Sequence, residues 1–311
     1  MTKPFFTIII PIYNEQESLL PLVKQLEKAL PKLKKPTEVI FINDGSSDKS
    51  SYILNKLKSK LFKIIIIQFT RNFGQTAAFS AGFDQARGKI IITMDGDLQN
   101  DPQDIGKMFE LMKEQKADIV VGWRSKRRDP LLRSLISNIA NRIISGPQYG
   151  QVHDLGCSLR VYKKETLTNL KLYGEMHRFI PILASASGAK LVEMKVRHHP
   201  RQFGKSKYGL IRTFKVLLDL ITVKFLTDFQ TKPIYMFGFT GIALIFLSFI
   251  AGLYVVLRHI FFNGVWVSPM LFIMTILFTV GVVCILMGLL AEIQIRTWYE
   301  SSGKKSYIIK K

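Results

Sequence analysis

Short apolar runs alternate with longer amphipathic stretches along the first 122 residues. The runs are rich in isoleucine and valine and lie at 7–12, 39–42, 64–69, 90–94 and 118–122. Runs of this length and composition are typical of strands that are buried on both faces. The stretches between them predict helices at about 16–30, 49–60, 76–86 and 103–114. Strands that alternate with helices in this way predict an α/β fold, with a mostly parallel sheet covered by helices on both faces.

The pattern becomes less regular after residue 122. Residues 123–133 are strongly basic, and a helix is expected at about 131–145. Residues 153–162 indicate a loop that leads into a strand. A short helix at 179–187 and a further strand at 191–198 complete the part of the chain that has the character of a globular domain.

Residues 210–229 form a strongly amphipathic segment. Apolar side chains recur at intervals of three and four, and the charged residues lie between them. This pattern predicts a helix that lies in a membrane interface. A helix packed against the soluble core would show the same pattern, and the interfacial interpretation depends on the segments that follow.

Two long segments without charge follow, at 234–257 and 269–291. At 1.5 Å per residue, each is long enough to cross the roughly 30 Å hydrocarbon layer of a bilayer. Lys232 precedes the first segment, and five basic residues follow the second: Arg296, Lys304, Lys305, Lys310 and Lys311. The positive-inside rule therefore predicts that the globular domain before these segments and the C-terminal tail are cytoplasmic, at the inner (plasma) membrane, although Arg258 and His259 argue weakly for the opposite orientation.

The chain carries 44 lysines and arginines against 23 acidic residues, a formal charge of +21. This excess indicates a polyanionic partner: nucleic acid, an anionic membrane surface or a phosphorylated substrate. The two apolar segments, and the lack of zinc-ligand spacing or an RNP pattern, disfavour nucleic acid. The only cysteines, Cys157 and Cys284, lie far apart, so no disulfide framework is expected and a reducing compartment is favoured.

Polar residues follow the ends of the predicted strands, where ligands bind in open α/β sheets. Asp95, Asp97 and Gln99 come directly after the buried run 90–94, at spacings of two residues. Side chains at this spacing can project to one side of an extended chain, and their oxygens suit Mg²⁺ or Mn²⁺ shared with a phosphate substrate. The alternative is an acidic turn in which Asp101 caps the next helix before Pro102.

The motifs of better-known nucleotide-binding and hydrolytic enzymes are missing. The chain has no G-x-G-x-x-G and no G-x-x-x-x-G-K-[ST], which argues against a dinucleotide-dependent dehydrogenase and a P-loop NTPase. It also has no G-x-S-x-G and no H-E-x-x-H. A nucleotide could still bind if a metal ion neutralised its phosphates and carboxylates accepted hydrogen bonds from its base or ribose.

Several motifs together carry a family resemblance: IPIYNEQESL, VIFINDGSSDKS, RNFGQTAAFSAG, MDGDLQNDP and DLGCSLRVYKKE. With HRFIPILASASGAKLVEMKVRHHPRQFGKSKYG and the two apolar segments, the chain resembles inverting family 2 glycosyltransferases of the GT-A fold. It is most similar to those that transfer sugars to polyprenyl phosphates, a group that includes dolichyl-phosphate mannose synthase and bacterial undecaprenyl-phosphate glucosyltransferases. The processive-synthase signature Q-x-x-R-W is missing, which disfavours polymerisation.

The resemblance implies roles for particular residues on the donor side. Pro11, Tyr13 and Glu15 would hold the nucleotide base, and Asp44 would accept hydrogen bonds from the base or the ribose. The metal ligands would be Asp95, Asp97 and Gln99, with Asp97 as the principal ligand.

The resemblance also implies a set of residues around the sugar and the phosphates. Asp154 would lie beside the sugar and the acceptor phosphate. The cations that meet the donor or acceptor phosphates would be drawn from Arg124, Arg128, Arg133, Arg201, Lys205 and Lys207, the last three closing over them.

Each of these residues also has a purely structural interpretation. Asp44 could cap a turn, Glu15 could be a first-turn helix charge, Asp154 could be a turn residue and Arg160 a surface strand residue. The basic run 124–133 could face solvent or lipid headgroups.

We therefore expect three segments: a GT-A catalytic domain at 1–208, amphipathic interfacial helices at 209–232, and a transmembrane hairpin with a basic tail at 233–311. The expected reaction is metal-dependent transfer of one hexose to undecaprenyl or dolichyl phosphate, with inversion. UDP-glucose is the expected donor, with GDP-mannose and other UDP-sugars as alternatives, and a homo-oligomer is expected. Two other possibilities are a membrane-tethered glycosyltransferase with a soluble acceptor and a non-catalytic scaffold or flippase partner.

Overall fold

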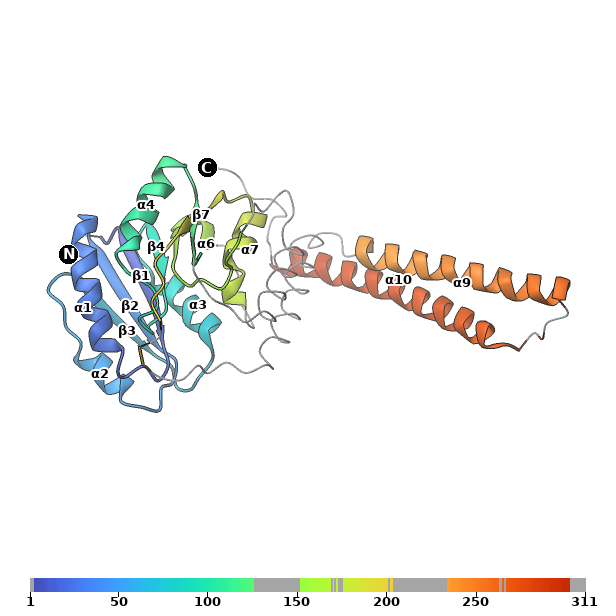
Figure 1. Cartoon of the computed structure of the whole chain (residues 1–311), viewed down its shortest axis with the longest axis horizontal. Coiled ribbons are helices and arrows are strands. Elements are labelled where there is room, and N and C mark those ends of the chain that lie inside the picture. The colour runs from blue at the N-terminus through green and yellow to red at the C-terminus, as the bar shows by residue number, and fades with distance from the viewer. Residues whose placement is uncertain are drawn as a thin grey trace. The chain divides into compact units, whose positions relative to one another are not determined.

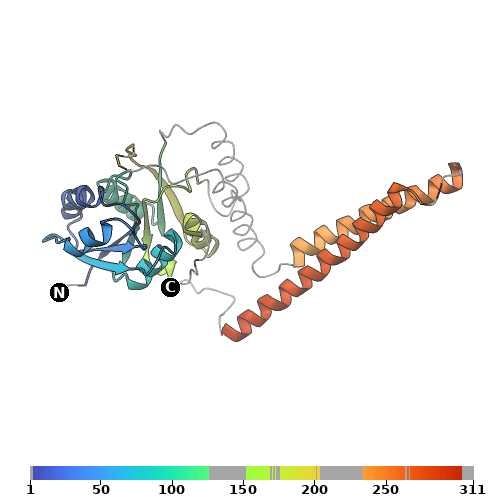
Figure 2. The ribbon, with the colours of Figure 1, turned by 90° about the horizontal axis from the view of Figure 1, so that it is seen from below.

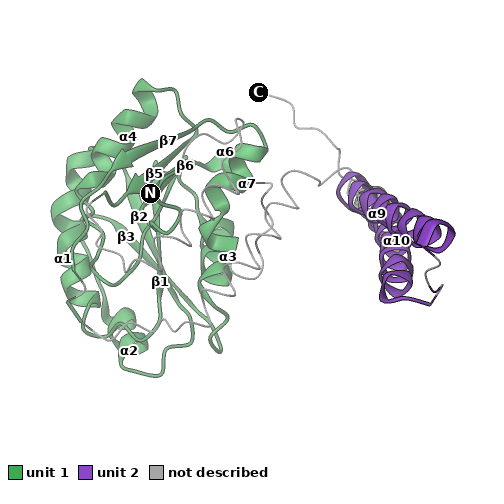
Figure 3. Ribbon diagram, turned by 45° about the vertical axis from the view of Figure 1, so that its right-hand side comes forward, with its two compact units in different colours: residues 1–223 green, residues 224–311 purple. Residues whose placement is uncertain are grey.

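The computed structural model describes residues 3–125, 152–168, 170, 172, 176–200, 202–203, 234–262, 265 and 267–302. The chain divides into two compact units, residues 1–223 and 224–311 (Figure 3). The expected boundaries at 208/209 and 232/233 fall within residues 204–233, outside the described part. The expected helices at 131–145 and 210–229 lie outside it as well.

The first unit is built on one seven-stranded sheet (Figure 1). Its strands are β1 (Phe6–Ile12), β2 (Thr37–Asn43), β3 (Lys63–Gln68), β4 (Ile90–Thr93), β5 (Ile119–Trp123), β6 (Arg160–Lys163) and β7 (Leu191–Lys195). Their order across the sheet is β3-β2-β1-β4-β6-β5-β7. Only β6 is antiparallel to its neighbours β4 and β5, and the other pairs of adjacent strands are parallel. The mostly parallel α/β sheet is therefore confirmed.

Five helices of this unit match expected ones, with shifts at their ends: α1 (Leu19–Ala29), α2 (Ser50–Lys56), α3 (Gln75–Gln85), α4 (Asp104–Glu114) and α7 (Ile180–Ala186). The short elements η1 (Leu30–Leu33), α6 (Lys164–Leu167) and η2 (Met176–Arg178) were not predicted as separate helices. Helix α1 begins three residues later than residue 16, because the amides of Ser18 and Leu19 donate to the Glu15 carbonyl in a preceding turn.

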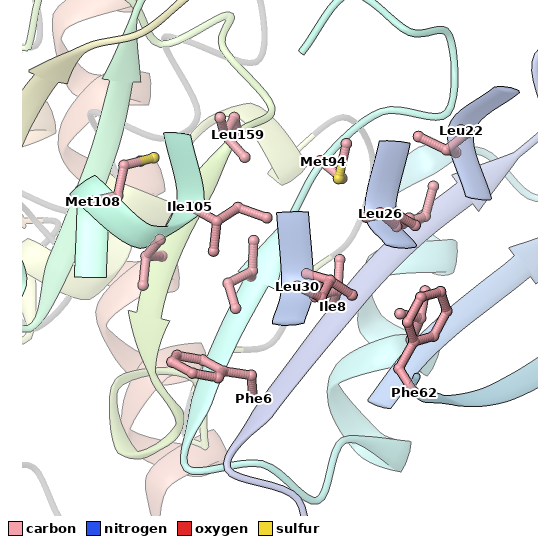
Figure 4. Packing of buried hydrophobic residues seen from close by; sticks show 14 of the residues in the cluster. Phe6, Ile8, Leu22, Leu26, Leu30, Phe62, Met94, Ile105, Met108 and Leu159 are labelled. Atoms are coloured by element: carbon pink, nitrogen blue, oxygen red, sulfur yellow. The ribbon is translucent and has the colours of Figure 1, made fainter. Parts of the chain in front are cut away.

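Apolar side chains cover the sheet on both faces. Ile8 and Ile10 of β1 belong to one cluster with Leu22 and Leu26 of α1 and with residues of α4 (Figure 4). Ile9 of the same strand belongs to the opposite cluster, with residues of α3 and α7. In Figure 2 the dark blue α1 and the yellow α7 accordingly lie on opposite sides of the sheet. Since each fully buried aliphatic side chain contributes about 1.5–3 kcal/mol, both faces of a strand must be apolar, which explains the uninterrupted isoleucine runs.

The second unit is a pair of long helices, α9 (Ile234–Phe262) and α10 (Pro269–Ser302). Both qualify as membrane spans by length and composition, with mean hydropathies of 2.4 and 2.8. Only 22% and 6% of their most apolar windows are buried, whereas the core helix of a soluble protein would be mostly buried. The two helices touch at Gly241 and Gly281, where a Cβ on Gly241 would lie 2.6 Å from the Gly281 carbonyl oxygen.

Candidate active site

The loops after β1 and β2 are joined by hydrogen bonds at the carboxyl edge of the sheet. The amide of Asn14 donates to Ser46 Oγ (3.0 Å), and the amide of Ser47 donates to Asn14 Oδ1 (2.8 Å). Asn14 has a φ of 53°, a left-handed conformation that asparagine tolerates better than most residues. The parallel pairing of β1 with β2 thus brings the segment after Pro11 against the segment after Asn43.

Three residues expected at the nucleotide base lie along this junction. Pro11 is half-buried near the end of β1, and Tyr13 is 37% exposed in the loop that follows. The Glu15 carboxylate accepts a hydrogen bond from Ser18 Oγ (3.2 Å), and its backbone amide donates to Ser50 Oγ (2.9 Å). Glu15 is therefore fixed at the entrance to α1, consistent with either interpretation made from the sequence.

Asp44 is buried and anchors the loop between β3 and α3. Its Oδ1 accepts the backbone amide of Phe73 (2.7 Å), and its Oδ2 accepts that of Gly74 (2.9 Å). Burial raises the pKa of the Asp44 carboxyl above its ordinary value, and the two amide hydrogen bonds oppose that rise. In this structure the carboxylate orders the 72–74 loop beside the base-binding residues expected from the sequence.

Gly45 allows the same loop to approach. Its φ is +66°, and a Cβ at this position would lie 2.3 Å from the carbonyl carbon of Arg71. No side chain fits at that distance, so the glycine is required both by the backbone conformation and by the contact. The chain reversal after β2 can therefore pack directly on the backbone of the 71–74 loop.

Asp95 lies at the end of β4 between groups that come from three other parts of the chain. Its Oδ1 accepts a hydrogen bond from Gln75 Nε2 (3.1 Å), and the Ser158 hydroxyl is a second hydrogen-bond partner. Burial and the neighbouring Asp97 raise the pKa of Asp95, whereas Ser158, Arg124 and Arg160 act to lower it. Because Asp97 raises this pKa through its charge, the two carboxylates are close enough to repel each other.

The backbone of the acidic turn is strained where it positions Asp97. Asp97 Oδ1 accepts the amide of Gln99 (3.2 Å), and the buried Leu98 between them has a φ of +65°. A bulky residue with a positive φ is uncommon, and such strain is concentrated at functional sites. Gly96 lies against β1, since a Cβ there would be 2.5 Å from Ile12 Cδ1.

This arrangement suits a divalent cation that is shared with a substrate. The part of the chain that the structure describes holds no group of three His, Cys, Asp or Glu residues able to enclose a metal ion. Two repelling carboxylates, Asp95 and Asp97, do fit a hard cation, because the cation would relieve their repulsion. Mg²⁺ commonly takes one or two carboxylates plus phosphate oxygens, so a diphosphate would complete the ligand set.

Arg124 and Asp154, which the sequence placed separately near phosphates and sugar, bind each other. Arg124 Nε donates to Asp154 Oδ2 (2.7 Å) and Arg124 Nη2 donates to Asp154 Oδ1 (2.8 Å). Burial would lower the pKa of Arg124, but the hydrogen bonds and charge of Asp154 outweigh burial and raise it. The guanidinium thus stays charged, and it also lowers the pKa of Asp95.

A second layer of contacts holds Asp154 in place. Glu193 of β7 accepts the backbone amides of His153 (2.7 Å) and Asp154 (3.3 Å) through Oε1. Its Oε2 lies 2.7 Å from Nδ1 of His153, whose ring stacks on Trp123 with centroids 4.4 Å apart. Glu193 had no signal in the sequence beyond its place on a predicted strand.

The segment that follows β7 binds the segment that follows the acidic turn at Asp95 and Asp97. Arg197 forms ion pairs with Asp101 (3.0 Å) and Asp104 (2.9 Å), and the amide of His199 donates to the carbonyl of Gln99 (2.9 Å). Asp101 pairs with Arg197 and also accepts the amide of Gln103 through its side chain (2.9 Å), but α4 begins at Asp104 with Gln103 at the N-cap position, so the expected capping role of Asp101 is wrong. These contacts fix the backbone at Gln99, whose side chain remains a predicted metal ligand.

Five of the expected phosphate-binding cations cannot be placed. Arg128, Arg133, Arg201, Lys205 and Lys207 lie outside the described residues. Arg160, by contrast, is 4% exposed, so its interpretation as a surface strand residue is wrong. Gln75, Ser158 and Arg160 were missed as parts of the site, because their contacts with the Asp95 region depend on pairing between distant segments.

The chain is similar in sequence to a known protein family and to individual proteins of known activity. Residues 7–170 match the model of the family described as glycosyl transferase family 2. The chain is 39% identical over 309 residues to a dodecaprenyl-phosphate galacturonate synthase of Rhizobium johnstonii, a match that covers 98% of this chain and 91% of the relative. It is 34% identical over 308 residues to an undecaprenyl-phosphate 4-deoxy-4-formamido-L-arabinose transferase of Pectobacterium atrosepticum, with 98% and 92% covered.

Solved structures share the fold at much lower identity. The first 349 residues of Staphylococcus aureus TarS, in complex with UDP-GlcNAc, superpose with a TM-score of 0.51 at 17% identity, covering 71% of this chain and 66% of that one. Glucosyl-3-phosphoglycerate synthase of Mycobacterium tuberculosis, in complex with Mn²⁺ and UDP-glucose, gives 0.51 at 16%, covering 71% and 79%. Similarity at this level concerns the fold alone, and it confirms the expected GT-A architecture.

Proposed function

The chain belongs to glycosyl transferase family 2, and from that premise we propose that it moves a single sugar from a nucleotide-sugar donor to a polyprenyl phosphate. The observation that carries the proposal is the similarity to two prenyl-phosphate sugar transferases over 98% of the chain, the apolar helices α9 and α10 included. A membrane-tethered transferase with a soluble acceptor could use the same helices as an anchor, and it would be active without a lipid phosphate.

The donor's diphosphate requires positive charge as the glycosidic bond breaks. Asp97, Asp95 and Gln99 would hold Mg²⁺ or Mn²⁺, and that ion, when bound, would neutralise the departing diphosphate. Gln75 and Ser158 keep Asp95 oriented toward the same edge of the sheet. The base and ribose would lie along Pro11, Tyr13 and Glu15, next to the loop ordered by Asp44.

The acceptor would be a lipid phosphate monoester. Its second pKa, near 6, leaves it largely dianionic at neutral pH, so it is a nucleophile without help from a strong general base. Asp154 binds the Arg124 guanidinium with both oxygens, which suits a role in orientation better than proton abstraction. Direct attack on the anomeric carbon would invert its configuration.

Glucose and galacturonate are the first two candidates for the sugar. UDP-glucose is the donor expected from the sequence, and galacturonate appears in the name of the relative that is 39% identical. GDP-mannose, other UDP-sugars and a donor of 4-deoxy-4-formamido-L-arabinose are further alternatives. The acceptor is proposed as undecaprenyl rather than dolichyl phosphate, because the names of both relatives contain bacterial polyprenyl phosphates.

A donor screen tests the proposal. Purified full-length protein in detergent is mixed with undecaprenyl phosphate, Mn²⁺ and one radiolabelled donor at a time, and label is followed into the organic phase. We expect label from one donor, lost on adding EDTA and restored by Mg²⁺ or Mn²⁺. If no donor labels the lipid while Mn²⁺ and nucleotide still bind, the proposed sugars or the proposed acceptor are wrong; if nothing binds, the non-catalytic scaffold is supported instead.

The membrane arrangement is tested separately. We propose that α9 and α10 form a hairpin with the catalytic unit and the C-terminal tail on the cytoplasmic side of the inner membrane. Single cysteines introduced at exposed positions 49 and 265, in a variant without native cysteines, should differ in labelling by an impermeant reagent added to intact cells. Position 265 should react and position 49 should not.

A further inference from the structure

The charged side chain of Arg160 is buried at the start of β6, an interior strand of the sheet that pairs with β4 just before the acidic turn. The register of β4 with β6 pairs Thr93 with Arg160, and the antiparallel direction places Ser158 opposite Asp95. Thr93 Oγ1 donates to the carbonyl of Ser158 (2.8 Å), and the Ser158 hydroxyl is a hydrogen-bond partner of Asp95. Arg160 is thus two residues from a direct partner of a proposed metal ligand.

The guanidinium of Arg160 joins two segments through backbone carbonyls. On one side it donates to the carbonyls of Leu155 (2.6 Å) and Cys157 (2.7 Å), which directly follow Asp154. On the other side it donates to the carbonyls of His177 (2.8 Å) and Arg178 (3.0 Å) in η2. Five N–H donors in a rigid fork allow one arginine to make such a set of bonds, whereas a lysine could satisfy fewer of them.

The second segment leads back to Asp95 by another route. The Nδ1 of His177 lies 2.9 Å from Thr76 Oγ1, and the amide of His177 also donates to that hydroxyl (3.3 Å). Gln75, the neighbour of Thr76, donates to Asp95. Arg160 is therefore part of a closed set of contacts that runs from Asp95 through α3, η2 and β6 and returns to Asp95 through Ser158.

The charge of Arg160 has a different role from its hydrogen bonds. Burying a cation is costly unless a negative charge compensates it. Among the described residues, Arg160 donates hydrogen bonds to carbonyls and, at 3.5 Å, to the Tyr162 hydroxyl, and none of these bonds goes to a carboxylate. Asp95, which is joined to the same set of contacts through Gln75 and Ser158, is the carboxylate at the end of β4 that the charge of Arg160 reaches.

We propose that Arg160 is a positioning residue for the transfer reaction: it fixes the Asp154 loop and Ser158 against the metal-binding turn, and it keeps a permanent positive charge behind Asp95. The inference rests on the proposed function for its effect on turnover. Its effect on metal binding can be measured without turnover.

Two variants separate the charge of Arg160 from the hydrogen bonds of its guanidinium. Arg160→Lys keeps the charge and loses most of the contacts with carbonyls. We expect turnover to fall by at least tenfold and up to roughly 10²-fold, the loss typical of misplaced groups, with little change in Mn²⁺ affinity. Arg160→Gln removes the charge as well, so turnover should fall at least as far while Mn²⁺ binds more tightly. A residue needed only for the fold would lose turnover and metal affinity together.

The measurement is Mn²⁺ binding followed by electron paramagnetic resonance, with and without UDP, on full-length protein in detergent, beside initial rates of lipid labelling. Lys163→Met is the matched control, because Lys163 lies on the same strand but forms a partly exposed pair with Asp118. It should match the wild type in both measurements.

Wild-type turnover in Arg160→Gln would overturn the inference, and so would weaker Mn²⁺ binding in that variant. If neither variant folds, Arg160 serves the fold alone and the inference is also overturned. A wild-type protein that labels no lipid would refute the proposed function, yet tighter Mn²⁺ binding by Arg160→Gln would still support the charge behind Asp95.

Discussion

The guanidinium of Arg124 binds both carboxylate oxygens of Asp154, which lies 30 residues further along the chain. The side chains are 11% and 12% exposed, so the pair is largely removed from water. Arg124 directly follows β5, and Asp154 lies in the loop that leads into β6. The pair therefore connects these two antiparallel strands at the edge of the sheet where substrates would bind.

Removing one partner of this pair should destabilise the protein more than removing both. Arg124→Ala or Asp154→Ala leaves a buried charge without its counterpart, which typically costs about 3–5 kcal/mol. The double variant should therefore melt at a higher temperature than either single variant, so that the single effects are not additive. Thermal unfolding of all four proteins in the same detergent measures this, and additive shifts would show that the two residues do not depend on each other.

Asp97→Asn should abolish most transfer while the fold is retained. The change removes one negative charge from the proposed metal site, and stabilisation of the departing diphosphate by the metal is worth several kcal/mol, so we expect a loss of about 10²-fold or more in turnover. Asp84→Asn, on the exposed side of α3, is the control and should transfer sugar at the normal rate. Wild-type turnover of Asp97→Asn at saturating Mg²⁺ would refute the metal assignment.

Gly45→Ala should lower stability more than Gly188→Ala. Both glycines have positive φ, 66° and 93°, but a Cβ at Gly45 would lie 2.3 Å from the backbone of Arg71 while one at Gly188 meets nothing within 4 Å. The conformational cost of about 1 kcal/mol is common to both, and the clash is added only at Gly45. Melting temperatures compare the two, and equal shifts would mean that the 71–74 loop moves away freely.

Cys157 should resist alkylation in the folded protein. Burial raises the pKa of its thiol from 9.0 to about 11, although Arg124 nearby acts to lower it. The folded state thus holds this proton more tightly than the unfolded state, so its contribution to stability is present below pH 9 and is lost as the pH rises through 11. A pKa difference of two means about 10²-fold less thiolate at pH 8.5, besides the steric protection.

The measurement uses a Cys284→Ser variant, in which Cys157 is the only thiol. Iodoacetamide labelling at pH 8.5, quantified by mass spectrometry, should be at least 10²-fold slower in the native protein than in denaturant. Equal rates would show that the loop carrying Cys157 opens readily and that the Asp154 segment is not held as described.

The β-strand runs were predictable from the sequence because burial on both faces of a sheet requires continuous apolar residues. Each described strand was predicted, and so were both long apolar helices, whose length and composition qualify them as membrane spans. The acidic turn at Asp95 and Asp97 could be placed as well, because the carboxyl ends of parallel strands share one edge of the sheet.

The ends of some helices differ from the predicted ends, because local hydrogen bonds and backbone conformation set them rather than the spacing of apolar residues. Helix α1 starts at Leu19 because the Glu15 carbonyl takes the first amides, and α2 ends at Lys56 where Leu57 becomes extended. Neither feature leaves a trace in the spacing of apolar residues.

What the sequence by itself determined is the alternation of strands and helices, the carboxylates at the strand ends and the two apolar helices, since each follows from local composition or spacing. The tertiary structure alone decided the partners. The antiparallel direction of β6 sets Ser158 opposite Asp95 and buries Arg160, and the same strand pairing joins Arg124 to Asp154. Contacts between side chains so far apart in the chain have no periodic signature, because they depend on strand order and direction, which only the packing of the whole sheet selects.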